Sequence, residues 1–185
     1  MKLTARRVLV LITLFALVLS GCKTVPWTEY SSTEGQFSVL LPAAPTTDVK
    51  PVATQSGQVE MHFYSLTTGN TDYLISYADY PISLFQNTPI KSILDGARDG
   101  AVKNSQGRLI TESDISLDSY PGREINVESS DSANLMRAHL YVVNQRLYQV
   151  IVITPRASAG SADVTKFLDS FQLATPANPL PTVAP

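Results

Sequence analysis

The stretch that decides the fold is Leu135-Met-Arg-Ala-His-Leu-Tyr-Val-Val143, then Asn144-Gln145, then Leu147-Tyr-Gln-Val-Ile-Val-Ile-Thr154. Two runs rich in β-branched and aromatic residues, separated by a tight polar turn, predict an antiparallel β-hairpin. In the first arm every second residue is apolar, so that Met136, Ala138, Leu140 and Val142 share one face. The second arm is apolar on both faces from Val150 to Ile153, which is typical of a central strand covered on both sides.

Further strands are expected on the N-terminal side of this hairpin. The pattern predicts them at residues 27–30, 36–41, 59–66, 73–80, 109–117 and 123–128. Three prolines mark the segment from Pro42 to Pro51, which we therefore predict to be a loop. Pro121-Gly122 fits the two central positions of a type II turn, because proline pre-sets φ and glycine accepts a positive φ.

Two helices are expected to cover the sheet. The first has Thr88 as its N-cap, Pro89 at its first helical position and Gly107 as its terminator. The second begins near Ser161. Their apolar faces are formed by Ile90, Ile93, Leu94, Ala97 and Ala101 in the first, and by Val164, Phe167, Leu168 and Phe171 in the second. This order of elements predicts an α+β fold, an antiparallel β-sheet flanked by helices.

The first helix also carries a charged stripe and two glycines. Charged residues recur every four positions along this helix, at Lys91, Asp95, Asp99 and Lys103. This spacing predicts a solvated face with i,i+4 partners. The alternative is that Asp95 and Asp99 are metal ligands. Gly96 and Gly100 each cost about 1 kcal/mol relative to alanine inside a helix. We expect close packing of the helix on the sheet to explain them, with a partner surface as the alternative.

The N-terminus has the three parts of an export signal. A basic start, Lys2 to Arg7, precedes the apolar run Val8–Leu19, which is too short to span a bilayer as a helix. Leu19-Ser20-Gly21-Cys22 then resembles the bacterial lipoprotein signal. That resemblance implies cleavage between Gly21 and Cys22, attachment of acyl chains to Cys22, and stable anchoring in lipid.

This signal predicts the organisation and location of the chain. Residues 1–21 are the signal peptide, 22–26 a lipidated tether, 27–173 one α+β domain, and 174–185 a proline-rich disordered tail. The expected location is the extracytoplasmic face of the cell membrane or outer membrane, with membrane lipid as a partner through Cys22. Cys22 is the only cysteine, so no internal disulfide can form.

The charge of the mature chain argues against nucleic acid as a partner. The signal removes three of the 14 basic residues and none of the 16 acidic ones, which leaves a net charge of about −5. Nucleic-acid binding requires a basic surface.

The sequence contains no motif that carries a known chemistry. H-E-x-x-H, C-x-x-C, G-x-S-x-G and glycine-rich phosphate loops are all missing. His62 and His139 are predicted to be surface histidines, with a two-histidine metal site completed by Glu60 as the alternative. Arg123 and Glu124 are expected on opposite faces of a strand, as a solvated ion pair beside a turn. We therefore predict no catalytic, cofactor-binding or metal-binding residues, and no enzyme.

Four segments carry a resemblance to a known family. They are Phe37-Ser-Val-Leu-Leu-Pro42, Tyr120-Pro-Gly-Arg-Glu124, Arg146-Leu-Tyr-Gln-Val-Ile-Val152 and Lys166-Phe-Leu-Asp-Ser-Phe171. Over Trp27 to Leu173 the chain resembles the PsbP-like group of small α/β/α-sandwich domains. The resemblance implies an antiparallel sheet between helical layers. It also implies a non-enzymatic role in the assembly or stabilisation of a larger complex, or in docking to one.

Three classes of function follow from these observations. The first is a non-catalytic envelope lipoprotein that docks on or stabilises a membrane-associated protein complex through a partner the sequence does not identify. The second is a carrier or sensor of a small apolar or lipid ligand held between sheet and helix, which a large apolar cavity would favour. The third is a hydrolase of unknown type, which a pocket with converging titratable groups would favour.

Overall fold

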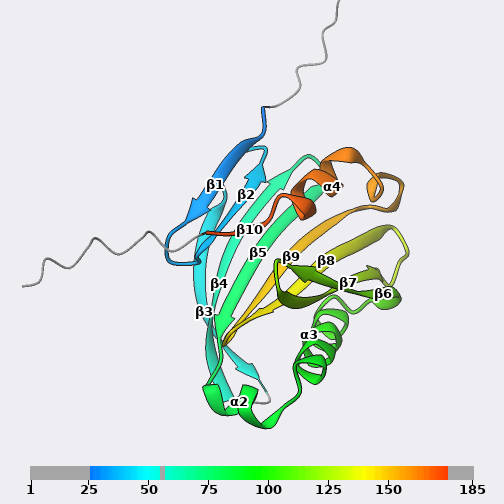
Figure 1. The fold of residues 1–185 in the computed structure, drawn as a ribbon. Coiled ribbons are helices and arrows are strands. Elements are labelled where there is room, and N and C mark those ends of the chain that lie inside the picture. Colours follow the sequence, from blue (N-terminus) through cyan, green and yellow to red (C-terminus); the bar gives the residue numbers. More distant parts are fainter. Residues whose placement is uncertain (1–25, 55–56, 175–185) are drawn as a thin grey trace, which may run out of the picture.

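A seven-stranded antiparallel sheet is the centre of the molecule in the computed structural model, which describes residues 26–54 and 57–174 (Figure 1). The predicted signal peptide at 1–21, the predicted lipidation site Cys22 and the predicted tail at 174–185, apart from its first residue, lie outside the described residues. In spatial order the strands are β3 (Thr46–Thr54), β4 (Gly57–Thr68), β5 (Thr71–Asp79), β9 (Arg146–Pro155), β8 (Asn134–Val143), β7 (Tyr120–Glu128) and β6 (Arg108–Leu117).

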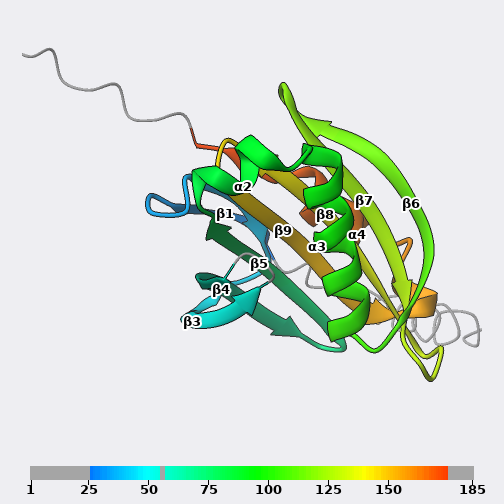
Figure 2. The same ribbon diagram turned by 90° about the horizontal axis from the view of Figure 1, so that it is seen from below.

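Two further layers cover the faces of this sheet. One face is covered by a small sheet, ordered β1-β2-β10, and by helix α4 (Ala162–Asp169). The small sheet consists of β1 (Thr28–Ser32), β2 (Phe37–Leu41) and β10 (Gln172–Leu173). The other face is covered by α3 (Ile90–Asn104) and the short α2 (Ile82–Asn87); Figure 2 shows α3 in front of the sheet and α4 behind it.

The central hairpin forms as the sequence predicts. β8 and β9 pair from Asn134↔Pro155 to Val143↔Arg146 around the turn at Asn144, whose φ of 55° is one that asparagine tolerates. β9 lies between β5 and β8, in the middle of the large sheet. Its residues Val150 and Ile151 are buried on opposite faces, which confirms the expectation of a strand covered on both sides.

The two faces of the large sheet bury different side chains. The face under the small sheet is aromatic, with Tyr64, Tyr73, Tyr77, Tyr141 and Tyr148 packed against Phe37, Phe167 and Phe171. The face under α3 is aliphatic and holds Ile93, Leu94, Ile125, Val127, Met136, Leu140, Val142, Leu147 and Ile151. The domain therefore has two cores, separated by the sheet.

The segment Pro42–Pro51 is not the loop that its prolines predict. Most of it belongs to β3, which pairs with β4 from Thr46↔Ser65 to Thr54↔Gly57. β3 is an edge strand of the large sheet, and an edge strand can hold a proline because the missing N–H can face solvent. The prediction of a loop was wrong because proline excludes only a central strand, and β3 lies at the edge of the sheet.

Pro121-Gly122 is not at a turn either. β6 ends at Leu117 and β7 begins at Tyr120, so the turn falls at Asp118-Ser119, with Asp118 at φ 52°. Gly122 instead lies inside β7, where a Cβ would stand 2.7 Å from the Leu140 carbonyl oxygen and against the Tyr141 ring. Glycine is needed here for close approach of a neighbouring strand.

The helices lie where the sequence predicts, but several details differ. α3 ends at Asn104, with Gln106 and not Gly107 in the left-handed conformation (φ 51°), and α4 ends at Asp169, before Phe171. α3 begins at Ile90 with Pro89 as its N-cap, one residue later than expected, and α2 has no counterpart in the prediction. α4 begins after Ser161, whose hydroxyl accepts a hydrogen bond from the Val164 N–H, as expected. Gly96 and Gly100 do not pack on the sheet, since a Cβ at either position would meet nothing within 4 Å.

Candidate functional site

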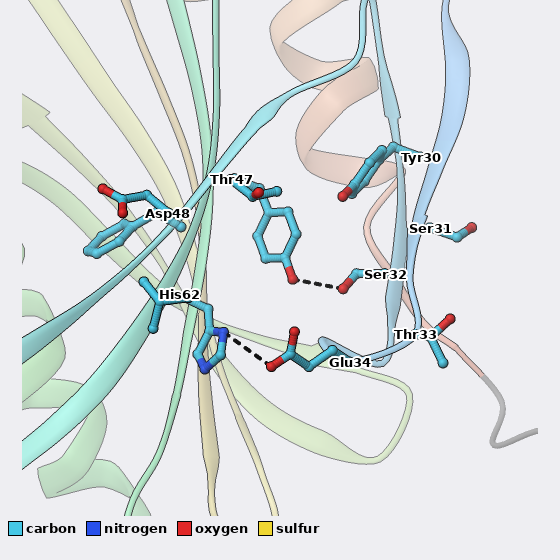
Figure 3. Close-up of a pocket in the computed structure, with 11 residues that line it drawn as sticks. Tyr30, Ser31, Ser32, Thr33, Glu34, Thr47, Asp48 and His62 are labelled. Atoms are coloured by element: carbon cyan, nitrogen blue, oxygen red, sulfur yellow. Dashed lines mark hydrogen bonds and ion pairs between the residues drawn. The ribbon is translucent and has the colours of Figure 1, made fainter.

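An open hollow of about 320 Å³ lies between the small sheet and one edge of the large sheet (Figure 3). Residues 30–34, from β1 and the turn after it, form one wall. Residues 47–49 of β3 and 62–64 of β4 form the other. In the described residues, β1 pairs only with β2, and β3 pairs only with β4. The hollow is therefore bordered by two unpaired sheet edges.

The side chains that line the hollow are polar or aromatic, with Val49 as the aliphatic exception. Tyr30, Ser32 and Glu34 point from the β1 side toward His62 on β4, whereas the Asp48 carboxylate points away behind β3 (Figure 3). The Glu34 Oε1 atom lies 3.6 Å from His62 Nδ1 and closes one end of the hollow. With 73% of its side chain exposed, Glu34 presents its carboxylate at the mouth.

A buried hydrogen-bond pair fixes the two walls to each other. The Ser32 Oγ and Tyr64 hydroxyl oxygens are 2.8 Å apart, and the Gly35 N–H donates to the same Ser32 Oγ at 2.9 Å. Tyr30 and Phe37 pack around Tyr64, with ring centroids 5.8 Å and 5.1 Å away. The depth of the hollow is thus set by directional contacts, which hold it open in one geometry.

Arg146, at the start of β9, holds the turn that carries Glu34. Its guanidinium donates to both carboxylate oxygens of Asp79 at 2.7 Å and to the Glu34 and Gly35 carbonyl oxygens at 3.1 Å. The Tyr148 hydroxyl donates to the same Gly35 oxygen at 2.7 Å. The turn between β1 and β2 is therefore anchored to the centre of the large sheet.

Tyr77 forms the layer beneath this wall. Its ring lies 4.4 Å from the stacked His62 ring and 4.2 Å from the Arg146 guanidinium carbon. Burial, and then the neighbouring Tyr64, raise the pKa of Tyr77, and the same two causes raise that of Tyr30. The Arg146 hydrogen bond lowers the pKa of Asp79. At neutral pH the tyrosines are uncharged, and Asp79 is a carboxylate held by Arg146.

This arrangement suits binding better than nucleophilic attack. Ser, His and Glu are residue types that hydrolases use, but the Ser32 hydroxyl is occupied by Tyr64 and by the Gly35 N–H. Among the contacts of the described residues, no hydrogen bond joins Ser32 to His62. A nucleophile and its base must be within hydrogen-bond reach of each other. The groups that remain available are hydroxyls, ring faces and one carboxylate.

The two histidines differ from each other more than the sequence indicates. His62 borders the hollow, with its side chain 18% exposed, and shares a face of β4 with Tyr64. His139 is not at the surface: it is buried on β8, with Nδ1 3.1 Å from the Tyr141 hydroxyl, and burial lowers its pKa. Within residues 26–54 and 57–174, no three His, Cys, Asp or Glu side chains are grouped to hold a metal.

Arg123 is the polar residue whose role the sequence missed. Arg123 and Glu124 do lie on opposite faces of β7, but Arg123 is only 2% exposed and not solvated. It contacts Asp95, Glu112 at 3.5 Å and Asp114 at 3.4 Å. Asp95 therefore faces the sheet and not an outer stripe. The one sequence signal is that Arg123 has the same strand parity as the buried Ile125 and Val127.

The part of the chain that the structure describes holds no helix that combines the length and the apolar character needed to cross a membrane.

Comparisons with known proteins identify the fold. No family model and no curated protein matches the chain. The solution structure of the PsbP protein of the cyanobacterium Synechocystis matches with a TM-score of 0.58 at 13% identity, over 83% of this chain and 95% of that one. A Pseudomonas aeruginosa protein of unknown function matches at a TM-score of 0.41 and 11% identity, over 75% of this chain and 90% of that one, too weakly to carry an argument. The chain therefore has a PsbP-like α+β fold, as its sequence predicts.

Proposed function

We propose that the chain is a lipid-anchored, extracytoplasmic accessory protein that docks on a membrane-associated protein complex and catalyses no reaction. The observation that carries this proposal is the hollow itself. The Ser32 and Tyr64 hydroxyls that fix its walls are held in an internal hydrogen bond, while the sheet edges on either side of it are unpaired among the described residues. Unpaired edges beside a shaped hollow favour recognition of another polypeptide.

The positions of the chain ends support the same reading. Cys22 precedes Pro26 by four residues, a distance of at most about 14 Å in extended chain. Thr28, which follows, pairs with Leu41 at one end of the small sheet. The Glu34 turn lies at the other end of that sheet, about 13 Å farther along an extended strand. A lipid at Cys22 would therefore attach near the Thr28 end of the small sheet, and the Glu34 turn beside the hollow would lie at the other end.

The two other candidate functions have less support. A carrier of an apolar ligand requires an apolar cavity, whereas this hollow is open and lined by hydroxyls and Glu34. The space between α3 and the sheet is filled by side chains such as Leu94 and Leu140. A hydrolase that used Ser32 as its nucleophile and His62 as its base would require a hydrogen bond between them, which the contacts of the described residues lack.

The anchor is tested by Cys22→Ser. Loss of the acyl chains should release the cleaved protein from membranes or leave it uncleaved, and cell fractionation measures this. A cleaved Cys22→Ser form that still sediments with membranes after a high-salt wash contradicts the anchor.

Docking is tested by a photo-crosslinking amino acid at Ser31, which is exposed on the rim of the hollow. In intact cells it should give one discrete adduct that Cys22→Ser removes. The matched control is the same amino acid at Lys91, exposed on α3 across the large sheet. Equal adducts from both positions, or none from Ser31, contradict docking at the hollow.

A further inference from the structure

The free edge of β3 has a defined hydrogen-bonding register. Pro51 has no N–H, and a proline inside a strand is placed where the N–H side faces solvent. Because backbone groups alternate in direction along a strand, Thr47 and Val49 then also direct their N–H and C=O groups outward. β3 therefore offers two donors and two acceptors in its first half, beside the hollow.

The same residues direct their side chains to the hollow side of the sheet. Thr47 is in register with Tyr64 and Val49 with His62, so all four share one face. Val49 is 50% exposed, which makes it one of the most exposed large apolar side chains among the described residues. A strand added to β3 would cover Val49 and send every second side chain toward the hollow.

The charge at the hollow favours a cation. Glu34 is the carboxylate at its mouth, while the Asp48 carboxylate is paired with Lys50 Nζ at 2.6 Å outside it. The half-buried Tyr30 also lines the hollow, and aromatic rings attract ammonium and guanidinium groups. The acidic excess of the whole chain adds attraction over longer range.

We propose that an extended, basic segment of a protein partner pairs with β3 over Thr46–Lys50 and places one lysine or arginine side chain in the hollow against Glu34. This inference rests on the docking function proposed above and names the chemistry of the partner. The backbone edge supplies affinity, and the hollow selects the cationic side chain.

Features of the edge favour a short segment over a second copy of the chain. Pro51 interrupts the edge in its middle, and Lys50 places a charge beside it; both are common ways for proteins to prevent one sheet from pairing with another. The half that remains open, from Thr46 to Lys50, matches the span beside the hollow. The β1 wall of the hollow lies close to this half of β3 and limits the space beside it. A single strand needs far less space than a folded domain.

A peptide binding experiment tests the proposal with the full chain in detergent micelles. The probe is an acetylated nine-residue peptide of alternating threonine and valine with a central lysine. We expect saturable binding by fluorescence polarisation, weaker by about tenfold when the central residue is glutamate, because a like charge then faces Glu34. N-methylation of alternate backbone amides should abolish binding, since it removes the strand hydrogen bonds.

Two variants locate the binding. Glu34→Gln should weaken the lysine peptide by about tenfold, while Glu29→Gln, an exposed acid on the same hairpin, should leave binding unchanged. Val49→Pro removes an outward N–H, as Pro51 already does, and should abolish binding while the thermal melt stays that of the wild type. If Val49→Pro lowers the melting temperature, the N-methylated peptide with the wild-type protein tests the same hydrogen bonds.

Three results overturn the inference. They are the absence of binding, equal affinity for the lysine and glutamate peptides, and a β3 edge that sedimentation shows to be buried in a dimer which Val49→Pro dissociates. None of them affects membrane release by Cys22→Ser or the adduct at Ser31. The docking function can therefore stand where this inference fails.

Discussion

The two faces of the large sheet are held to their covering layers in different ways. Under the small sheet, tyrosine hydroxyls make specific bonds, such as Tyr148 to the Gly35 carbonyl and Tyr64 to Ser32. Under α3, the contacts are hydrophobic packing of aliphatic side chains, and the buried Arg123 with its ion pairs is the exception. Hydrophobic burial is not directional, whereas a hydrogen bond fixes distance and angle. The aromatic face therefore positions the hollow, and the aliphatic face contributes mainly stability.

The aliphatic face is tested most severely by Ile151→Asp. Ile151 is 7% exposed on the central strand β9, and an unpaired charge there costs several kcal/mol. We expect the domain to be unfolded at 25 °C, as measured by circular dichroism and urea titration. Ile110→Asp, at a 38% exposed position on the edge strand β6, is the control and should change little. A normal melt for Ile151→Asp would refute the central position of β9.

The ionic exception on the same face is tested by Arg123→Ala. The change leaves Asp95, Glu112 and Asp114 without their shared cation and opens a void, at a cost of about 3 kcal/mol. Arg98→Ala removes a more exposed guanidinium and should cost less than about 1 kcal/mol. Equal losses in urea unfolding for the two variants would mean that burial of Arg123 contributes nothing.

The aromatic face is tested by a pair of Tyr→Phe changes. Tyr148→Phe deletes the buried bond to the Gly35 oxygen and should cost about 1.5 kcal/mol. Tyr77→Phe deletes a buried hydroxyl that has no hydrogen-bond partner among the described residues, so the free energy of unfolding should stay the same or rise. If both variants lose the same stability in denaturant unfolding, the hydroxyl bonds do not distinguish this face.

The smallest effect is a pH dependence from His139 on the aromatic face. Burial lowers its pKa, so below the unfolded-state value of about 6.5 the unfolded chain binds a proton more readily than the folded one. The free energy of unfolding should therefore fall as the pH drops below that value and level off below the folded pKa. His139→Gln should flatten this slope between pH 7 and 5 in urea titrations. An unchanged slope would assign the pH dependence to other groups.

Much of the fold follows from pattern alone, as β8 and β9 illustrate. Their alternation fixes which residues share a face, and the doubly apolar run at Val150–Ile153 fixes the central strand, because a strand has only two sides. The N-cap of α4 at Ser161 is equally local, since the hydroxyl bonds a backbone N–H three residues on. Such features depend on near neighbours in the chain.

The errors fall where distant segments decide. Nothing local distinguishes a proline in a loop from Pro51 on an edge strand, because the difference lies in whether a strand stands beside it. Gly122 is explained by Tyr141 and Leu140 of a neighbouring strand and not by a turn. Arg123 appears solvated until α3 brings Asp95 over it.

The sequence by itself determined most of the strands, the two main helices and the order in which they occur, since each follows from a pattern in contiguous residues. Only the tertiary structure decided the hollow. It joins the Glu34 turn to His62 and Arg146, which are distant in sequence, through contacts that exist only after the small sheet packs on the large one. Periodicity reports which face a residue occupies, but not which residue lies opposite.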